Sequence, residues 1–413
     1  NKKNKKKNSK ILKLNRVYLF HKGIQHADQT CLALQESNQL HKFSTSRFFI
    51  KNRYPYKILN LFSDKSYIKK RLYTRYNKNL NKNKIELFGL FSWIQLLLKY
   101  IHLDNWFNKL EYKYFSKKII KDLKREIKNI NVIWGFNNCS YDVFKKFSKT
   151  KVYKVLDLTI GYILESERKY SKNNHIYRLS NYEKNKQISE IKLADKIVVG
   201  SKYVKKTLIN NNIKSSKIKV IKYGFDENLF KKKNLNKRSF NGKEILKILF
   251  VGQINERKGA DHLIKAVSAF KACEVKLTMI GTNSLKLFHQ NKLSTNIILK
   301  PFMQRKKLLK YFYNNHLFCF PTLYEGSALV IYEAVGSGLP ILTTTDSGHD
   351  VKKFGDIKIK SGSTKSIVSA INKILKKPSE IEKMSKKSVD LYKVYNWTRY
   401  RRQISKFVDK IKK

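Results

Sequence analysis

The stretch HLFCFPTLYEGSALVIYEAVGSGLPILTTTDSG, residues 316–348, changes its residue pattern several times along its length. A short apolar run at 317–320 meets Pro321 and a turn of small residues, and an apolar helical pattern follows at 329–335. Glycines and a proline end that pattern, and a second apolar run begins at 341–342. This order of strand, loop, helix, turn and strand is typical of a parallel βαβ unit.

Two carboxylates flank the predicted helix. Glu325 precedes it in the loop, and Glu333 follows eight residues later within the helix. At 1.5 Å per helical residue, the two side chains are separated by roughly 10–12 Å, about the reach from a sugar across a diphosphate to a ribose. The helix start between them, beside Gly326 and Ser327, favours an anion. The pattern fits a nucleotide-sugar, but it also fits two solvated glutamates on the rim of a helix.

The composition indicates a globular but very basic protein. A chain of 413 residues with 41% hydrophobic residues is expected to form two domains. It carries 89 Lys and Arg against 30 Asp and Glu, a formal net charge of +59. Such a charge attracts nucleic acid, anionic membranes or acidic substrates. The abundance of Lys, Asn, Ile and Tyr is equally expected of an A/T-rich genome, and both explanations stay open.

The sequence predicts a cytoplasmic protein without a disulfide framework, a zinc site or a membrane-spanning helix. Its cysteines are scattered and form no CxxC pair. Polar residues interrupt the stretch at 11–20, so it is a poor core for a signal peptide. No uncharged apolar run reaches about 18 residues.

Strand and helix patterns alternate in both halves of the chain. We therefore expect an α/β fold with two Rossmann-like, doubly wound parallel-sheet domains that face a cleft. The polar run at 231–244 has no apolar period and indicates a linker. The expected organisation is a basic tail at 1–15, an N-terminal acceptor domain at 16–228, a linker at 229–245, a C-terminal donor domain at 246–390, and a C-terminal helix at 391–413 that packs back on the N-terminal domain.

The most apolar stretch is IELFGLFSWIQLLLKYI at 85–101. Polar residues interrupt it, so we expect a buried or partner-facing helix. An interfacial helix is the alternative, because basic and aromatic residues at 47–82 precede it. In that alternative, residues 47–101 help the N-terminal domain to meet a lipid-linked or membrane-proximal acceptor.

Three ordered segments resemble the retaining GT-B glycosyltransferases of the large family 4 group (glycosyl transferases group 1). FVGQINERKGADHLIKA at 250–266 is similar to the family's strand and Arg-Lys-Gly loop. PTLYEGSALVIYEAVGSGLPILTT at 321–344 is similar to its Glu-x7-Glu motif. LADKIVVGSKYVKKTL at 193–208, with KIKVIKYGFDENLF at 217–230, is similar to the segment that closes its N-terminal domain. The resemblance covers the chain from about 190 to 350.

The resemblance implies a hexosyltransferase-like enzyme. It would move a sugar from a UDP- or GDP-linked donor to the hydroxyl of a carbohydrate or lipid-linked acceptor, with retention of anomeric configuration. The expected setting is cell-surface polysaccharide or glycolipid synthesis, with the protein peripheral on the inner face of the cell membrane and an anionic membrane surface as a further partner. The family needs no obligatory metal or other cofactor.

The resemblance also assigns the donor site. It implies that Arg257 and Lys258 bind the diphosphate and that Glu325 contacts the transferred sugar; these three are the predicted catalytic residues. It implies that Glu333 bonds the ribose hydroxyls. Two cations beside the N-terminus of a helix can stabilise a leaving nucleoside diphosphate. The alternative is that this basic pair is only the exposed start of a helix, as is common in a chain so rich in lysine. The other predicted donor-binding residues are Gly252, Gly326, Ser327, Ala328 and Leu329.

The acceptor side is predicted from the N-terminal half. Family members carry a glycine-rich loop after the first strand, and the corresponding segment HKGIQHADQ at 21–29 holds only Gly23. The family's histidine after a central strand is missing, because Asn-Asn-Cys stands at 137–139. We therefore predict Gly23, His26 and Asp157 as acceptor-side residues. A packing role for His26 and a turn-capping role for Asp157 are the alternatives.

Two other functions are compatible with parts of the sequence. GT-B sheets also serve sugar-nucleotide epimerases and phosphorylases. A non-enzymatic protein that binds polyanions or a membrane surface would explain the charge alone. The ordered donor motifs favour the transferase, and lysines spread over the whole chain indicate no specific nucleic acid partner.

Overall fold

The computed structural model describes residues 14–23, 25–46, 77–88, 104–170, 180–232, 238–285, 293–351 and 356–411. The chain divides into two compact units. The first comprises Asn1–Gly135, Lys146–Lys154 and Ile404–Lys413, and the second comprises Phe136–Lys145 and Val155–Gln403. All of the predicted donor-site residues belong to the second unit. The domain boundaries expected from the sequence stay predictions.

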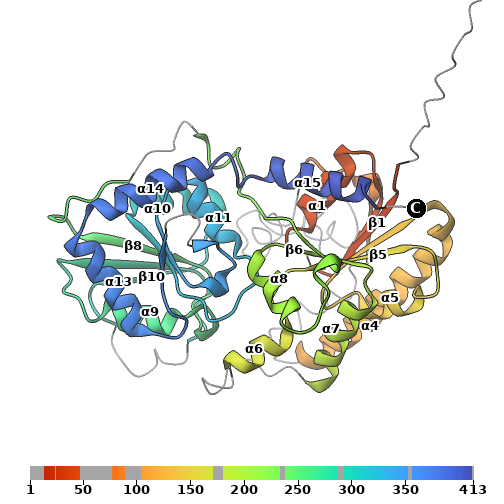
Figure 1. Cartoon of the computed structure of the whole chain (residues 1–413), viewed down its shortest axis with the longest axis horizontal. Coiled ribbons are helices and arrows are strands. Elements are labelled where there is room, and N and C mark those ends of the chain that lie inside the picture. The colour runs from red at the N-terminus through yellow and green to blue at the C-terminus, as the bar shows by residue number, and fades with distance from the viewer. Residues whose placement is uncertain are drawn as a thin grey trace, which may run out of the picture. The chain divides into compact units, whose positions relative to one another are not determined.

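The described strands form two sheets, drawn in Figure 1. The first contains β1 (Val17–His21), β2 (Leu40–Thr45), β3 (Ile85–Leu87), β4 (Val132–Phe136), β5 (Tyr153–Leu158), β6 (Lys196–Val199) and β7 (Ile218–Val220), in the order β3-β2-β1-β4-β5-β6-β7. The second contains β8 (Leu246–Val251), β9 (Val275–Ile280), β10 (Ile297–Lys300), β11 (Leu317–Phe320), β12 (Ile341–Thr343) and β13 (Ile357–Lys358), in the order β10-β9-β8-β11-β12-β13. Pairing such as that of β8 with β9 and β11 is parallel, which confirms the predicted α/β class with two doubly wound sheets.

Helices connect these strands. They are α1 (Ala27–Glu36), α4 (Asp104–Glu126), α5 (Tyr141–Lys146), α6 (Ile163–Tyr170), α7 (Asn181–Leu193), α8 (Lys202–Ile209), α9 (Ala260–Val267), α10 (Arg305–Asn314), α11 (Leu329–Gly336), α13 (Thr364–Lys376), α14 (Ser379–Leu391) and α15 (Trp397–Asp409). Short 3-10 turns are η2 (Lys82–Lys84), η4 (Ile127–Asn129), η6 (Ser215–Lys217), η8 (Glu256–Lys258) and η10 (Thr345–Ser347). The structure confirms the predicted helix at 329–335 as α11, which extends one residue further.

The second sheet is covered on both faces. Figure 1 shows α10, α11 and α14 on one side of it and α9 and α13 on the other. Strand β8 therefore buries five of its six residues and forms an apolar run, as central parallel strands do. Helix α13 shows how the cover is built: Ser363 caps it by accepting from Ser366 N, and its buried residues recur at helical spacing at Ile367, Ala370, Ile371 and Ile374.

The strand order fixes where a ligand can bind. In the second sheet, β8 has β9 on one side and β11 on the other, so the chain winds in opposite directions from this point. Open α/β sheets bind ligands at the carboxyl ends of strands where the winding reverses. The loops that follow β8 and β11 hold Arg257, Lys258 and Glu325. In the first sheet the same reversal falls between β1 and β4.

Sequence patterns failed mainly at short strands. We did not predict β2, β3 or β13, and the last two are short strands at sheet edges. The predicted helix at 85–101 is wrong at its start, because Ile85 is buried and pairs with Phe43 of β2 as a strand. Pairing with a neighbour decides such a segment, whatever its own apolarity. Three parts of the predicted segments lie outside the described residues: 89–101 of that stretch, the tail before residue 14, and 233–237 of the linker.

The end of α15 belongs to the first unit. The side-chain amide of Asn15 donates to Val408 O at 2.7 Å and to Ile411 O at 3.0 Å. The ring of Phe407 meets Trp134 of β4 edge-on, with 5.8 Å between centroids. The last turn of this helix is therefore bound to a residue near the start of the described chain: Asn15 and Val408 are 393 positions apart.

A buried carboxylate closes the start of α5. Glu190 of α7 accepts from Ser140 N at 2.7 Å and from Tyr141 N at 3.1 Å through Oε1, and from Asn138 N at 2.8 Å through Oε2. These N–H groups have no partner within the helix, so a side chain from elsewhere satisfies them. Burial raises the pKa of Glu190 to about 7, although the three N–H donors act in the opposite direction.

Replacing Glu190 by Ala is expected to lower the free energy of unfolding by about 2–3 kcal/mol, because the N–H groups at the start of α5 lose their acceptor. Urea unfolding measures the change. Glu382 on α14 is exposed, and Glu382→Ala is the matched control, with an expected change within about 0.5 kcal/mol. Equal losses in both variants would contradict the capping role.

The same residue predicts a pH dependence. The folded-state pKa of Glu190 lies above its ordinary value of 4.5, so its contribution is full below pH 4.5 and is lost as pH rises through about 7. Glu190→Gln has no such titration. The decrease in melting temperature of the wild type between pH 5 and pH 8 should therefore be smaller in this variant.

Candidate functional site

The loop after β8 is shaped by a cap and a glycine. The side chain of Asn255 accepts from Lys258 N at 3.1 Å and closes η8. Gly259 follows with φ of 66°, a left-handed conformation, and a Cβ at this position would lie 2.1 Å from Pro321 O. Glycine therefore lets the loop after β8 lie directly against the chain that leaves β11.

Backbone contacts join these two loops. Arg257 O accepts from Leu323 N at 2.9 Å and from Thr322 Oγ1 at 3.1 Å. The Arg257 guanidinium returns a bond from Nη1 to Tyr324 O at 3.0 Å. Arg257 is thus held at both its backbone and its side chain, which fixes the direction of its charged group.

The predicted catalytic residues meet at this junction. Glu325 Oε2 accepts from Arg257 Nη1 at 2.7 Å and also pairs with Lys258 Nζ. The Lys258 ammonium lies 4.9 Å from the ring centroid of Phe320. The side chains of Arg257, Lys258 and Glu325 are 23%, 12% and 17% exposed, so their charges interact with little screening by solvent.

Burial and charge act together on these groups. Burial opposes ionisation of Glu325, but the positive charges of Lys258 and Arg257 outweigh it and lower the pKa of Glu325. Burial lowers the pKa of Lys258, and the charge of Arg257 adds to that effect while Glu325 opposes it. The group therefore holds two cations beside one ionised carboxylate.

The turn that follows Glu325 is packed closely against other loops of the second unit. A Cβ on Gly326 would lie 2.1 Å from Thr159 O, and Gly326 O accepts from Ser201 Oγ at 2.6 Å. Ser327 Oγ donates to Gly200 O at 3.2 Å. The turn is therefore rigidly placed.

Helix α11 begins directly after this turn, with Ala328 at its N-cap and Leu329 in its first turn. Ala328 N donates to Ser347 O at 3.1 Å. We predicted backbone donors for phosphate at 326–328, and that of Ala328 is already engaged within the protein. The structure puts Gly252 directly after β8 with φ of 153°, a conformation that residues with a side chain rarely adopt.

Glu333 lies apart from the charged group of Glu325. It is on α11 as predicted, and its Oε1 pairs with Arg305 Nε of α10 at 2.9 Å. Burial raises the pKa of Glu333, while the charge of Arg305 opposes that rise. We did not predict Arg305, since it is one of many basic residues on an amphipathic helix.

The predicted acceptor-side residues are divided between the two units. Gly23 and His26 belong to the first unit, where Gly23 O accepts from Thr45 Oγ1 at 3.3 Å and His26 is buried at the start of α1. Asp157 belongs to the second unit, is fully buried in β5, and its backbone O accepts from Asn137 N at 3.0 Å. Their roles toward an acceptor stay predictions.

Sequence patterns missed several residues that shape the site. Tyr324 is buried, and its hydroxyl donates to Tyr162 O at 2.8 Å. Thr322 and Asn255 position the loops through the bonds described above. Only the closeness of Tyr324 and Thr322 to Glu325 in the sequence could have indicated them.

The described residues contain neither a metal-binding cluster nor a membrane-spanning helix. They hold no group of three or more His, Cys, Asp or Glu side chains arranged to bind a metal ion. Nor does any helix in those ranges have the length and apolarity needed to cross a membrane.

Two doubly wound parallel sheets of this kind form the GT-B fold, and in this chain a basic pair and a carboxylate lie where the winding of the second sheet reverses. Residues 230–390 match the family described as Glycosyl transferases group 1. HepE of Anabaena, solved in complex with UDP and glucose, is similar in fold: the TM-score is 0.64 at 12% identity, over 96% of this chain and 100% of that one.

Two curated relatives are similar in sequence. An uncharacterized 41.2 kDa protein of the cps region of Klebsiella pneumoniae is 28% identical over 216 residues, half of this chain. An uncharacterized glycosyltransferase of Methanocaldococcus jannaschii is 27% identical over 150 residues, 33% of this chain. The matches span 56% and 38% of the lengths of these two relatives.

The charged group predicts a coupling that unfolding experiments can measure. Glu325→Ala leaves two neighbouring cations without their carboxylate, and we expect a loss of about 3 kcal/mol in the free energy of unfolding. The double variant Lys258→Ala/Glu325→Ala should lose less than the sum of its single variants, by about 1–3 kcal/mol.

Lys276 on β9 is exposed and is the matched control. Lys276→Ala removes the same charge, so its effect should add to that of Glu325→Ala within about 0.5 kcal/mol. Additive effects for both lysines would show that Lys258 and Glu325 are not coupled.

Proposed function

We propose that the protein is a retaining glycosyltransferase of the family 4 type, which transfers a hexose from a UDP- or GDP-linked donor to the hydroxyl of a carbohydrate or lipid-linked acceptor. One observation carries the proposal. The segment that matches Glycosyl transferases group 1, residues 230–390, contains the group of Arg257, Lys258 and Glu325 at the reversal point of its sheet.

The geometry supports a role in binding and activating the donor. A nucleoside diphosphate gains negative charge as it leaves the sugar, and fixed cations stabilise that charge most where solvent is excluded. Arg257 and Lys258 are such cations, because backbone and aromatic contacts hold them and they are mostly buried. A diphosphate bound here would compete with Glu325 for both cations, and the displaced carboxylate could then accept from hydroxyls of the transferred sugar.

Retention of configuration is supported by the state of Glu325. A general base is most effective when its pKa lies near the working pH. The neighbouring cations lower the pKa of Glu325, which makes this carboxylate a poor proton acceptor. Departure of the nucleotide and attack of the acceptor on the same face of the sugar would need no protein base on the donor side. Proton NMR of the first-formed product reports the anomeric configuration directly.

Glu333 is the proposed contact of the ribose. It lies on the helix that begins directly after the Glu325 turn, and Arg305 shields it from one side. We propose no metal or other cofactor, since the two cations supply the charge that a metal would. Transfer should therefore persist in excess EDTA.

Donor binding should stabilise the folded protein. A nucleoside diphosphate at 100 times its dissociation constant adds about 2.7 kcal/mol, which a thermal-shift panel of UDP, GDP and their hexose conjugates would detect. Lys258→Ala should lose the shift and reduce transfer by about 10²–10³-fold. Glu325→Ala should keep the shift with the free diphosphate and lose transfer, because its cations remain.

Lys276→Ala is the control for the change in net charge and should match the wild type in both assays. If Lys258→Ala and Glu325→Ala both retain donor hydrolysis and transfer, the assignment of this site is wrong. Turnover of the donor without any acceptor would instead favour an epimerase.

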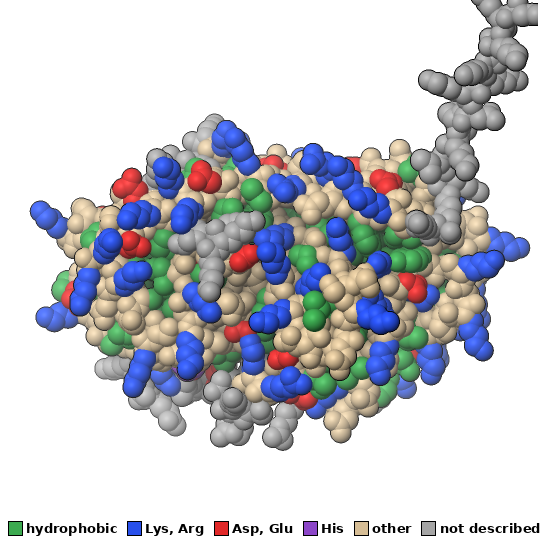
Figure 2. All heavy atoms as spheres, in the orientation of Figure 1, with side chains coloured by type: hydrophobic (Ala, Val, Ile, Leu, Met, Phe, Trp, Pro, Cys, Tyr) green, Lys and Arg blue, Asp and Glu red, His purple; other side chains and the backbone are tan. Residues whose placement is uncertain are grey.

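We also propose that the protein works in the cytoplasm, bound peripherally to the inner face of the membrane during cell-surface polysaccharide or glycolipid synthesis. The net charge of +59 supports this, and Figure 2 shows Lys and Arg side chains across the whole drawn face with few Asp and Glu. An anionic surface attracts such a protein over about a Debye length. The segment 47–101, in which we predicted a membrane contact, lies largely outside the described residues.

Sedimentation with vesicles tests this proposal. Vesicles rich in phosphatidylglycerol should retain the protein at 50 mM salt and release most of it at 500 mM, because the Debye length shortens several-fold. Neutral phosphatidylcholine vesicles should retain little. Equal retention by both vesicle types, or retention that salt leaves unchanged, would contradict electrostatic association.

A further inference from the structure

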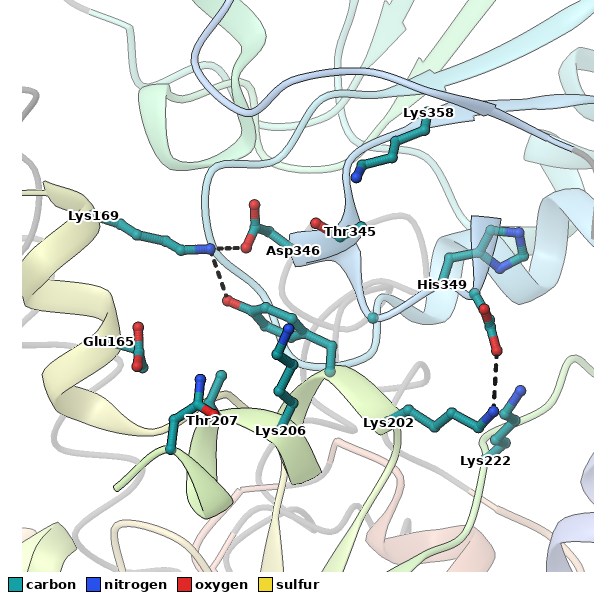
Figure 3. A pocket seen from close by; sticks show the side chains of 14 residues that line it. Glu165, Lys169, Lys202, Lys206, Thr207, Lys222, Thr345, Asp346, His349 and Lys358 are labelled. Carbon is teal, nitrogen blue, oxygen red and sulfur yellow. Dashed lines mark hydrogen bonds and ion pairs between the residues drawn. The ribbon is translucent and has the colours of Figure 1, made fainter. Parts of the chain in front are cut away.

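A pocket of about 470 Å³ lies in the second unit. Its walls come from α6, α8, Lys222 after β7, the segment 345–350 and Lys358 of β13, as Figure 3 shows. None of the predicted donor-site residues lines it. Its volume falls within the range of pockets that hold small molecules.

The lining of this pocket has an excess of positive charge. It contains five lysines against three carboxylates, with His349 counted as neutral. Two of the lysines are already paired. Lys169 Nζ contacts Asp346 and donates to Tyr203 OH at 3.2 Å, and Lys202 Nζ lies 3.5 Å from Asp350.

The charge that remains belongs mainly to Lys206 and Lys358. The side chain of neither residue has a hydrogen bond or ion pair with any described residue. Figure 3 shows both ammonium groups extending into the pocket from opposite walls, α8 and β13. Folding thus brings two uncompensated cations, 152 positions apart in the chain, to face one space.

The rest of the lining is polar. Thr345 and Asn210 add a hydroxyl and an amide, and Glu165 adds a carboxylate that can accept from hydroxyls. Burial lowers the pKa of Lys169, whose ammonium lies over the Tyr203 ring at 5.1 Å from the ring centroid. Hydroxyl-binding groups around a doubly positive centre are suited to a polar anion of sugar size.

We infer that this pocket is a second ligand site, which binds the phosphate monoester of a sugar-sized molecule through Lys206 and Lys358. A phosphate monoester carries a charge of about −1.5 to −2 at pH 7, which matches the excess charge of the lining. Lysines bind phosphate as point charges, so two of them can converge on one group without a fixed fork geometry.

The pocket touches the donor turn. A Cβ on Gly348, which lines the pocket, would lie 2.1 Å from Gly326 O. Ser347, next to it, accepts from Ala328 N at the start of α11. The inferred ligand therefore binds against the same short segment that positions Glu325, yet uses different side chains from those proposed for the donor.

Isothermal titration calorimetry tests the inference directly, with glucose 6-phosphate, inorganic phosphate and glucose as probes at constant ionic strength. Glucose 6-phosphate should bind most tightly, inorganic phosphate at least several-fold more weakly, and glucose not measurably. Lys206→Ala/Lys358→Ala should weaken binding of glucose 6-phosphate at least tenfold. Asp346→Asn removes a negative charge from the lining and should strengthen it several-fold.

The matched control is Lys386→Ala/Lys276→Ala. It also removes one lysine from a helix and one from a strand, both exposed and outside the pocket lining, so it causes the same change in net charge. It should bind glucose 6-phosphate as the wild type does. An equal loss in both double variants, or no binding by the wild type at millimolar concentration, would overturn the inference.

Lys258→Ala separates this site from the donor site. The variant should lose its response to a nucleoside diphosphate and keep its affinity for glucose 6-phosphate, whereas Lys206→Ala/Lys358→Ala should do the opposite. If Lys258→Ala loses both ligands, glucose 6-phosphate binds at the donor cations and the second site is wrong. Failure of the proposed transferase activity would leave this comparison unaffected.

Discussion

The closeness of backbone segments around residues 321–328 is the constraint on which the rest of the second unit depends. Carbonyl oxygens approach the α-carbons of Gly259, Gly326 and Gly348 so closely that a Cβ on any of them would lie 2.1 Å from oxygen. The segments that contain Thr159, Gly259 and Gly348 can approach residues 321–328 this closely only because the three glycines lack side chains. This close approach places a guanidinium, an ammonium and a carboxylate within bonding distance, although each comes from a flexible side-chain type.

Partly buried charges like these cost free energy to bring together, and their burial is also what makes them effective in binding an anion. Two cations with one carboxylate leave a net positive charge in a place with little solvent, and folding must offset the lost hydration. An anionic ligand that reaches this place meets charges that are already oriented, so little reorganisation is needed when negative charge develops. The basic composition has a separate effect, because it makes the cavities of this chain more positive in general. A positive lining alone therefore does not identify an anion-binding pocket, whereas lysines without partners among the described residues, such as Lys206 and Lys358, do.

The sequence was informative where function depends on loops that follow strands. The resemblance to a glycosyltransferase family assigned Arg257, Lys258 and Glu325. Their positions in loops that follow apolar runs agree with that assignment, because parallel strands bring such loops to one edge of a sheet. Residues that act through distant partners gave no such signal: Glu190 closes α5 from α7, and Lys206 faces Lys358 only after folding. Strands β3 and β13 escaped prediction because a few residues at a sheet edge depend on their neighbour for their structure.

The composition of the first unit has a consequence for the order of events during synthesis. This unit is made of three separate stretches of chain, and the last of them, from Ile404 onward, supplies Phe407 and the carbonyls that Asn15 binds. A ribosome that has released β1 and β4 must still translate the whole second unit before the first can be completed. Until then Trp134 lacks its partner, so the nascent chain exposes apolar surface for tens of seconds at about 5–20 residues per second. The topology of this chain therefore delays the burial of that surface until the last residues are translated.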